Sequence, residues 1–301
     1  PRVLTPGRRR LFETPDPDTS MRRKADSKGR RPRLGLALSG GAARGLAHVG
    51  VLKVFAEHGV PVDCVAGTSA GALVGGAFAS GMPVEEVEKI GRSLRWRDFG
   101  RMTLSKLGVQ SNAFLEEYVR AHFPVTRFEE LPTPFAAVAT DLHTGARVVM
   151  RDEGDLGFAI RASCAIPGWY VPVTDSVGRQ LVDGGLVANL PVSVVRSLGA
   201  EVVVAVDVNQ EGAKFMGPPA TLIGVLIQSM LVVQRVAVEH QRQLSDVCIS
   251  PSVGHLRWDE LTRAAEFIDA GVEAARAAMP AVKELLEPQA EEGHGWFGLR
   301  R

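Results

Sequence analysis

Ser69 stands at the centre of Gly67-Thr68-Ser69-Ala70-Gly71, which matches the pattern G-x-S-x-G. The chemistry that this pattern allows is nucleophilic attack on a carbonyl, with the serine held on a sharp turn between a strand and a helix. Gly67 and Gly71 fit such a turn because its close backbone contacts leave no room for Cβ atoms. The amide of Ala70 would lie at the positive end of the helix. The alternative is an ordinary serine in a glycine-rich turn.

A second glycine-rich loop lies nearer the start of the chain, after a short apolar run. It reads Ser39-Gly40-Gly41-Ala42-Ala43-Arg44-Gly45. The bare N–H groups of Gly40, Gly41 and Ala42, with that of the residue after the serine, are expected to form an oxyanion hole. Each such donor is worth about 2.7–4 kcal/mol of transition-state stabilisation. Arg44 would brace the loop or add a positive field, with Gly45 as a supporting residue.

Asp183 follows a short run at residues 179–182 and precedes Gly184 and Gly185. A carboxylate near the serine would act as a general base. By itself, however, an acid followed by two glycines is more typical of a hairpin turn. The seven histidines have no distinctive local setting. The sequence therefore offers a serine, an acid and an oxyanion loop, without an obvious histidine for a Ser-His-Asp triad.

Patterns for cofactors and metals are missing from these motifs. The first loop has its glycines as G-G-x-x-x-G, which is not the dinucleotide pattern G-x-G-x-x-G, and no P-loop Gly-Lys-Ser/Thr follows. No loop of clustered acids predicts calcium, so neither a metal nor an organic cofactor is expected. Cys64, Cys164 and Cys248 are widely spaced among largely apolar neighbours. They predict buried thiols in a reducing, cytoplasmic compartment rather than disulfides or a zinc site.

The elements expected around these motifs alternate between short apolar runs and helical patterns. Strands are expected at residues 34–38 and 62–66, each followed by a helix, at about 44–58 and 70–79. Further helices are expected at 83–94, 111–123, 221–244 and 261–286, and further strands at 135–140, 146–150 and 201–208. This order predicts an α/β fold with a mainly parallel sheet covered by helices. The strand at 201–208, apolar almost throughout, is expected near the centre of the sheet.

The charge of the chain is unevenly distributed. Overall, 35 Lys and Arg face 34 Asp and Glu, but residues 1–33 alone hold eleven basic and four acidic residues. This segment is expected to be a flexible basic tail on a mildly acidic domain at 34–288, with a frayed end at 289–301. The longest apolar stretch, residues 220–233, is too short to span a membrane.

The basic tail allows two interpretations. A solvated tail is favoured, and the alternative is peripheral contact with an anionic membrane. A role in nucleic-acid binding is not expected, because no aromatic-lined basic surface accompanies the tail. The motifs specify no oligomeric state.

Taken in order, the motifs resemble those of the patatin-like phospholipase family, and within it the bacterial members. Residues 40–52 read as G-G-x-x-R-G-x-x-H-x-G-x-L, and residues 161–168 and 182–191 also look like that family. The resemblance covers roughly residues 34–286. Ala42 departs from it, since many members have a third glycine there. A methyl group should still permit backbone donation.

The resemblance implies a three-layer α/β/α hydrolase with a Ser–Asp dyad. Ser69 would attack the ester carbonyl of a lipid or other acyl ester while Asp183 takes its proton, giving an acyl-enzyme that water hydrolyses. Aspartate is a weaker base than histidine by roughly 3.5 kcal/mol, so burial is expected to raise the pKa of Asp183. Phospholipase, lysophospholipase and general esterase activities all fit. The alternative is a non-catalytic lipid- or partner-binding regulator on the same fold.

Two further features have two interpretations each. His48 lies within the first motif, where packing of the first helix is favoured over lining of the site. Apolar residues of the helix at 221–244 recur at helical spacing, namely Leu222, Val225, Leu226, Met230 and Val233. Packing in the core is the favoured interpretation of these residues, and a lid or lipid-facing surface is the alternative.

Overall fold

The computed structural model describes residues 30–210, 219 and 221–288, of which Arg33–Leu286 form one compact unit. All the described helices and strands lie within this unit. The segments expected to be tails, 1–33 and 289–301, fall almost entirely outside the described residues.

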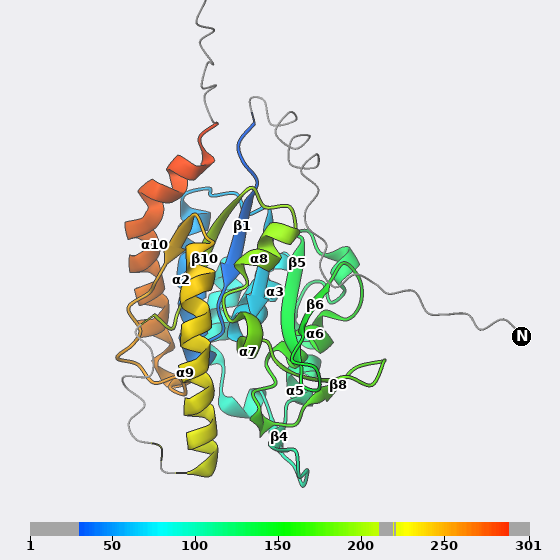
Figure 1. Cartoon of the computed structure of the whole chain (residues 1–301). Helices are drawn as coiled ribbons and strands as arrows, with labels where there is room; N and C mark the ends of the chain where they lie inside the picture. The colour runs from blue at the N-terminus through cyan, green and yellow to red at the C-terminus, as the bar shows by residue number, and fades with distance from the viewer. Residues whose placement is uncertain (1–29, 211–218, 220, 289–301) are drawn as a thin grey trace, which may run out of the picture. The chain divides into compact units, whose positions relative to one another are not determined.

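A mainly parallel sheet forms the middle of this unit (Figure 1). Its strands are β1 (Leu34–Leu38), β2 (Cys64–Thr68), β5 (Phe135–Asp141), β6 (Arg147–Arg151), β8 (Val173–Thr174), β9 (Gln180–Asp183), β10 (Val202–Val206) and β11 (Val247–Ile249). Their order is β11-β10-β1-β2-β5-β9-β8, with β6 paired to β5. The first five strands in this order are parallel, whereas β6 and β9 run antiparallel to β5 and β8 runs antiparallel to β9. The expected parallel sheet is confirmed.

Helices cover both faces of the sheet. They are η1 (Ala42–Leu46), α2 (Ala47–Glu57), α3 (Ala70–Ala79), α4 (Val84–Ser93), α5 (Ala113–His122), α6 (Leu156–Ser163), α7 (Gly185–Ala188), α8 (Val192–Ser197), α9 (Leu222–Gln243) and α10 (Ala264–Leu286), with short 3-10 turns η2 (Trp96–Asp98), η3 (Phe128–Glu130) and η4 (Leu261–Arg263). A second, three-stranded sheet joins β3 (Arg101–Met102), β4 (Gly108–Ser111) and β7 (Gly168–Tyr170).

Side chains that alternate along each strand divide the core into two layers. Leu36 and Leu38 of β1 pack with α2, α3 and α10, whereas Ala37 between them packs with α7 and α8 on the other face. In Figure 1, α7, α8 and α9 lie in front of the sheet. The expected three-layer α/β/α architecture is therefore confirmed.

Two expected strands differ in position from those observed. Strand β2 begins and ends two residues later than expected, at Thr68, so it leads directly into Ser69. Strand β10 lies between β11 and β1, one place from the edge of the sheet rather than at its centre. Its apolar sequence is explained by pairing on both sides and by helices on both faces.

The prediction that the apolar residues of α9 pack in the core is wrong for most of them. Leu222, Val225, Leu226 and Val233 are exposed, with Leu222 76% and Val233 66% accessible. The buried stripe of α9 instead contains Ile227, Gln234 and Val238. The helix packs against α7, α8 and β7, and these contacts leave Leu222, Val225, Leu226 and Val233 uncovered.

Candidate active site

Along one edge, strand β5 pairs first with β2 and then, further along the same edge, with β9. Thr68, the last residue of β2, pairs with Val138 in parallel, and Asp183, the last residue of β9, pairs with Ala139 in the antiparallel sense. Because β2 and β9 run in opposite directions, both strands end at adjacent residues of β5. The sheet thereby brings Ser69 and Asp183 together from distant parts of the sequence.

Ser69 occupies a strained turn between β2 and α3. Its φ of 54° is in the left-handed region that residues with a side chain seldom adopt. The turn is also crowded. A Cβ atom on Gly67 would lie 2.2 Å from the carbonyl oxygen of Gly71, and one on Gly71 would lie 2.3 Å from that of Leu38. Both glycines are required, and strain of this kind is typical of a turn that projects a nucleophile.

Ser163, the last residue of α6, fixes the position of the serine turn by hydrogen bonds. Its Oγ accepts a hydrogen bond from the Ser69 amide at 2.8 Å, and its hydroxyl donates to the Val138 carbonyl at 2.6 Å. The residue is fully buried. Sequence reasoning assigned Ser163 no role, although it falls within the block at residues 161–168 that carries the family resemblance.

The Asp183 carboxyl is buried beside the serine. The amide of Gly185, the first residue of α7, donates to its Oδ1 at 2.7 Å, and the Thr140 hydroxyl donates to its backbone carbonyl at 2.9 Å. Burial raises the pKa of Asp183 from 3.8 to about 6, and hydrogen bonds from the Ser69 side chain and the Gly185 amide offset part of the rise. The increase expected from burial is thus present. Gly184, between Asp183 and the first residue of α7, is the N-cap of that helix.

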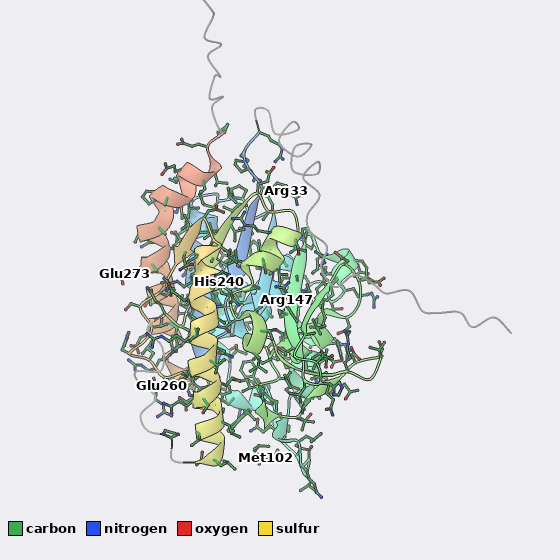
Figure 2. All side chains as sticks on the ribbon, viewed as in Figure 1. Arg33, Met102, Arg147, His240, Glu260 and Glu273 are labelled. Atoms are coloured by element: carbon green, nitrogen blue, oxygen red, sulfur yellow. The ribbon has the colours of Figure 1, made fainter. Side chains whose placement is uncertain are left out.

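The described histidines do not line the cavities at Ser69. His48 is fully buried, and its Nε2 lies 2.8 Å from the Ser39 carbonyl oxygen. Burial lowers the pKa of His48 to about 4, so the neutral ring can donate to that carbonyl. His240 is exposed on α9 (Figure 2). The favoured packing role of His48 agrees with these contacts.

The four amides expected to form an oxyanion hole differ in their hydrogen bonding. The Gly40 amide donates to the Asn189 carbonyl at 3.1 Å, so the prediction for Gly40 must be corrected: this N–H is used within the protein. In contrast, the amides of Gly41, Ala42 and Ala70 have no hydrogen-bond acceptor among the described residues. These three amides remain the candidate donors. Ala42 has a φ of 50°, which explains why a glycine is also suited to its position.

The loop that carries the Gly41 and Ala42 amides is braced by the segment before α10. Arg44 is buried, and its Nε and Nη2 donate to the Leu256 carbonyl at 3.2 and 3.0 Å. The Ala43 amide donates to the Trp258 carbonyl at 2.9 Å. Of the two interpretations of Arg44, bracing of the loop is the one that its contacts support. Gly45 lies against the start of α3, where a Cβ would meet that of Ala70 at 2.4 Å.

Two cavities meet at the serine. The first, of about 150 Å³, is lined by Ser69, Asp183 and the inner side of α9. The second, of about 70 Å³, lies on the α3 side, and Ser69 and Ala42 line both. Asn189 is buried in the first cavity, and its Nδ2 has no hydrogen-bond partner among the described residues. Asn189 is a further polar site residue to which the sequence motifs assigned no role.

All three cysteines are free thiols, but only Cys64 is fully buried. Cys164 and Cys248 are partly exposed, so the prediction of buried thiols is wrong for these two. Cys164 lines the second cavity because it is the C-cap of α6 and follows Ser163, which contacts the serine turn.

Within the described part of the chain, no cluster of three or more His, Cys, Asp or Glu side chains could hold a metal ion. None of the described helices has the length and apolar character needed to cross a membrane.

A model of the family described as patatin-like phospholipase matches residues 36–196, more than half of the 301 residues. The chain belongs to the patatin-like phospholipase family. The match includes the glycine loop, the serine turn and Asp183, and the patatin-like resemblance of these motifs is confirmed.

Patatin-like relatives are found in bacteria and eukaryotes. An uncharacterized NTE family protein of Mycobacterium tuberculosis is 39% identical over 181 residues, which cover 59% of this chain and 49% of that protein. Lysophospholipase NTE1 of Mycosarcoma maydis is 37% identical over 183 residues, covering 58% of this chain and 10% of that protein. The chain therefore spans about half of the mycobacterial relative and a small part of the fungal one.

A solved structure supports the patatin-like fold independently of sequence. The crystal structure of VipD from Legionella pneumophila aligns with a TM-score of 0.53 at 14% identity, covering 86% of this chain and 68% of that chain. At this identity the likeness shows a shared fold.

Proposed function

We propose that the protein is a lipid hydrolase that cleaves carboxylic esters with a Ser69–Asp183 dyad. The observation that carries the proposal is the meeting of β2 and β9 on β5, which places a strained serine beside a buried carboxylate. Membership of the patatin-like phospholipase family and a relative named as a lysophospholipase favour lipid esters as the substrates.

In the proposed reaction, Asp183 accepts the proton of the Ser69 hydroxyl while Oγ attacks the ester carbonyl. The amides of Gly41, Ala42 and Ala70 donate to the oxygen on which negative charge develops. The intermediate collapses as the alcohol leaves with the proton from Asp183. Water then attacks the acyl-enzyme while Asp183 accepts a proton from it. The bond between the acyl group and Ser69 Oγ breaks, Oγ takes the proton back from Asp183, and the carboxylic acid is released.

Burial of Asp183 removes most of the weakness of an aspartate base. With a pKa of about 6, the carboxylate is within about half a pKa unit of an ordinary histidine, which corresponds to roughly 0.7 kcal/mol. Asp183 thus approaches the basicity of an ordinary histidine, although not that of a triad histidine whose imidazolium is stabilised by an acid.

The same pKa predicts the dependence of hydrolysis on pH. Only ionised Asp183 can accept the serine proton, so kcat/KM should rise with pH, reach half its maximum near pH 6 and become constant above. Initial rates on a soluble ester between pH 4 and 9 measure this profile. A half-maximum near pH 4 would contradict the role of a buried Asp183.

The function is tested directly with a panel of acyl esters and phospholipids, together with a fluorophosphonate that labels activated serines. The proposal expects turnover of at least one ester class and stoichiometric labelling. Lipid binding with neither turnover nor labelling would instead identify a non-catalytic regulator.

We also propose that the outer side of α9 contacts the lipid surface from which the substrate comes. The inner side of this helix lines the cavity at Ser69 through Ile227, Met230 and Leu231. Its outer side exposes apolar residues that water solvates poorly, including Leu226 and Val233. A lipid surface would cover these residues while the cavity lies next to it.

Replacing Leu226 and Val233 with glutamine should weaken binding to phospholipid vesicles about tenfold or more, because each loses roughly 1 kcal/mol or more of apolar burial. The melting temperature should not fall, since both side chains are already exposed. Vesicle co-sedimentation and thermal denaturation measure the two effects. Val177→Gln is the matched control, because Val177 is 74% exposed but lies on the turn between β8 and β9. Equal weakening by the control would count against a specific role of α9.

A further inference from the structure

The second cavity at Ser69 differs in chemistry from the first. It is formed largely by aliphatic and aromatic side chains and contains no Asp, Glu, Lys, Arg or His among its lining residues. The first cavity, in contrast, includes the charged groups of Asp207, Arg235 and Arg242. The serine therefore stands between a cavity of mixed lining that includes charged groups and a cavity whose lining is almost wholly apolar.

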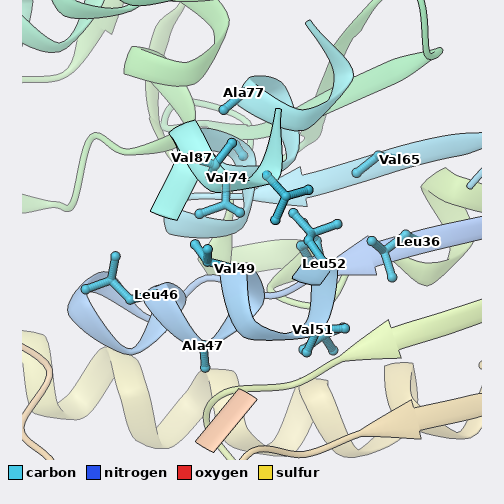
Figure 3. Packing of buried hydrophobic residues seen from close by; sticks show 14 of the residues in the cluster. Leu36, Leu46, Ala47, Val49, Val51, Leu52, Val65, Val74, Ala77 and Val87 are labelled. Atoms are coloured by element: carbon cyan, nitrogen blue, oxygen red, sulfur yellow. The ribbon is translucent and has the colours of Figure 1, made fainter. Parts of the chain in front are cut away.

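Apolar lining extends beyond the second cavity. A third cavity, of about 30 Å³, lies between α2, α3, α4 and α5 and is lined almost entirely by apolar atoms. Four side chains line both cavities and lie between them, namely Leu46, Leu73, Val74 and Leu94. Figure 3 shows Val74 of α3 between Val49 of α2 and Val87 of α4. Two adjacent apolar cavities thus extend from Ser69 into the helical layer.

Helix α3 lines both apolar cavities along its length. Ala70, Leu73, Val74 and Ala77 follow one another at helical spacing and line the second or third cavity in that order. Because a helix rises about 1.5 Å per residue, the stripe extends about 10 Å from the serine turn. This length suits several methylene groups of an acyl chain.

We propose that the second and third cavities together form the subsite for the acyl chain of the substrate. The alcohol part of the ester, including any charged head group, would occupy the first cavity. Methylene groups gain free energy on leaving water for apolar surroundings, whereas charged side chains lose hydration when hydrocarbon covers them. The proposal rests on the proposed ester hydrolysis and adds which end of the substrate lies on which side of Ser69.

Val74 is the position at which the subsite can be both narrowed and widened, because it lines both apolar cavities. The measurement is the ratio of kcat/KM for a dodecanoate ester to that for a butyrate ester of the same alcohol. Val74→Phe should lower this ratio about tenfold or more, the discrimination that one methylene group produces in an apolar pocket. Val74→Ala should raise it. General destabilisation would not move the ratio in opposite directions.

Leu231→Phe is the matched control, since it adds bulk to the first cavity on α9. If Leu231→Phe lowers the ratio and the Val74 variants do not, the acyl chain occupies the first cavity and the proposal is overturned. Should Val74→Phe fail to fold, Val74→Leu provides a smaller narrowing, for which an unchanged ratio would equally overturn it. A wild-type protein that hydrolyses no ester would refute the proposed function itself, a result distinct from active variants with an unchanged ratio.

Discussion

Replacing Ser69 with alanine should abolish ester hydrolysis in a protein that remains folded. The other hydroxyl of the turn, that of Thr68, is fully buried and donates to the Ala188 carbonyl at 2.7 Å, so it cannot replace Ser69. Loss of a serine nucleophile lowers kcat by roughly three to six orders of magnitude. The fold should persist because the two neighbouring glycines, not the hydroxyl, satisfy the close contacts of the turn. Turnover of a soluble ester and fluorophosphonate labelling measure the effect.

Ser80→Ala is the matched control for this experiment. Ser80 is also buried, at the other end of α3, and its hydroxyl donates to the Ala77 carbonyl at 2.7 Å. This variant should retain both turnover and labelling. Labelling that survives in Ser69→Ala would show that another nucleophile reacts, and the dyad would have to be abandoned.

Asp183→Asn should abolish hydrolysis as well, because the amide cannot accept the serine proton. Its shape preserves the hydrogen bond from the Gly185 amide to the side-chain oxygen, so the serine turn should stay intact. The expected loss is again of several orders of magnitude, since serine and base act as a unit. Initial rates at pH 8, where wild-type Asp183 is ionised, give the comparison.

The same substitution should stabilise the fold at neutral pH. The pKa of Asp183 is about 6 in the folded protein and near 3.8 when unfolded, so the folded state retains its proton to higher pH. Stability contributed by this group therefore falls as pH rises from about 4 to 6. At neutral pH the buried charge costs at most about 3 kcal/mol, and its removal should raise the melting temperature by several degrees. Below pH 4 the two proteins should melt alike with respect to this group.

Asp207→Asn tests whether the base is Asp183 or Asp207, the other buried carboxyl of the first cavity. Asp207 is fully buried, accepts from the Asn209 amide at 2.9 Å, and has a pKa that burial raises. Hydrolysis should persist in this variant. Activity that survives in Asp183→Asn but disappears in Asp207→Asn would reassign the base.

The local part of the site was predictable from sequence because its constraints are local. A strand, a turn that excludes Cβ atoms and a helix lie within about fifteen residues around Ser69, and Gly67 and Gly71 are the visible consequence of their contacts. The parallel sheet was predictable for a similar reason. Short strands that are apolar on both faces, and that alternate with amphipathic helices, are typical of a parallel sheet covered by helices on each face. The position of Asp183 followed from the family resemblance, since its Asp-Gly-Gly sequence alone favours an ordinary turn.

Only the tertiary structure decided how these pieces combine. The meeting of β2 and β9 on β5 depends on strand order and direction, which leave no local trace in either segment. Whether the Gly40 amide is free depends on Asn189, a residue distant in sequence. Likewise, the side of α9 that faces the sheet depends on what α7 and α8 can cover. The sequence by itself determined the serine turn and its elements, whereas pairing between distant segments determined the position of the proposed base, the candidate amides and the two cavities around the serine.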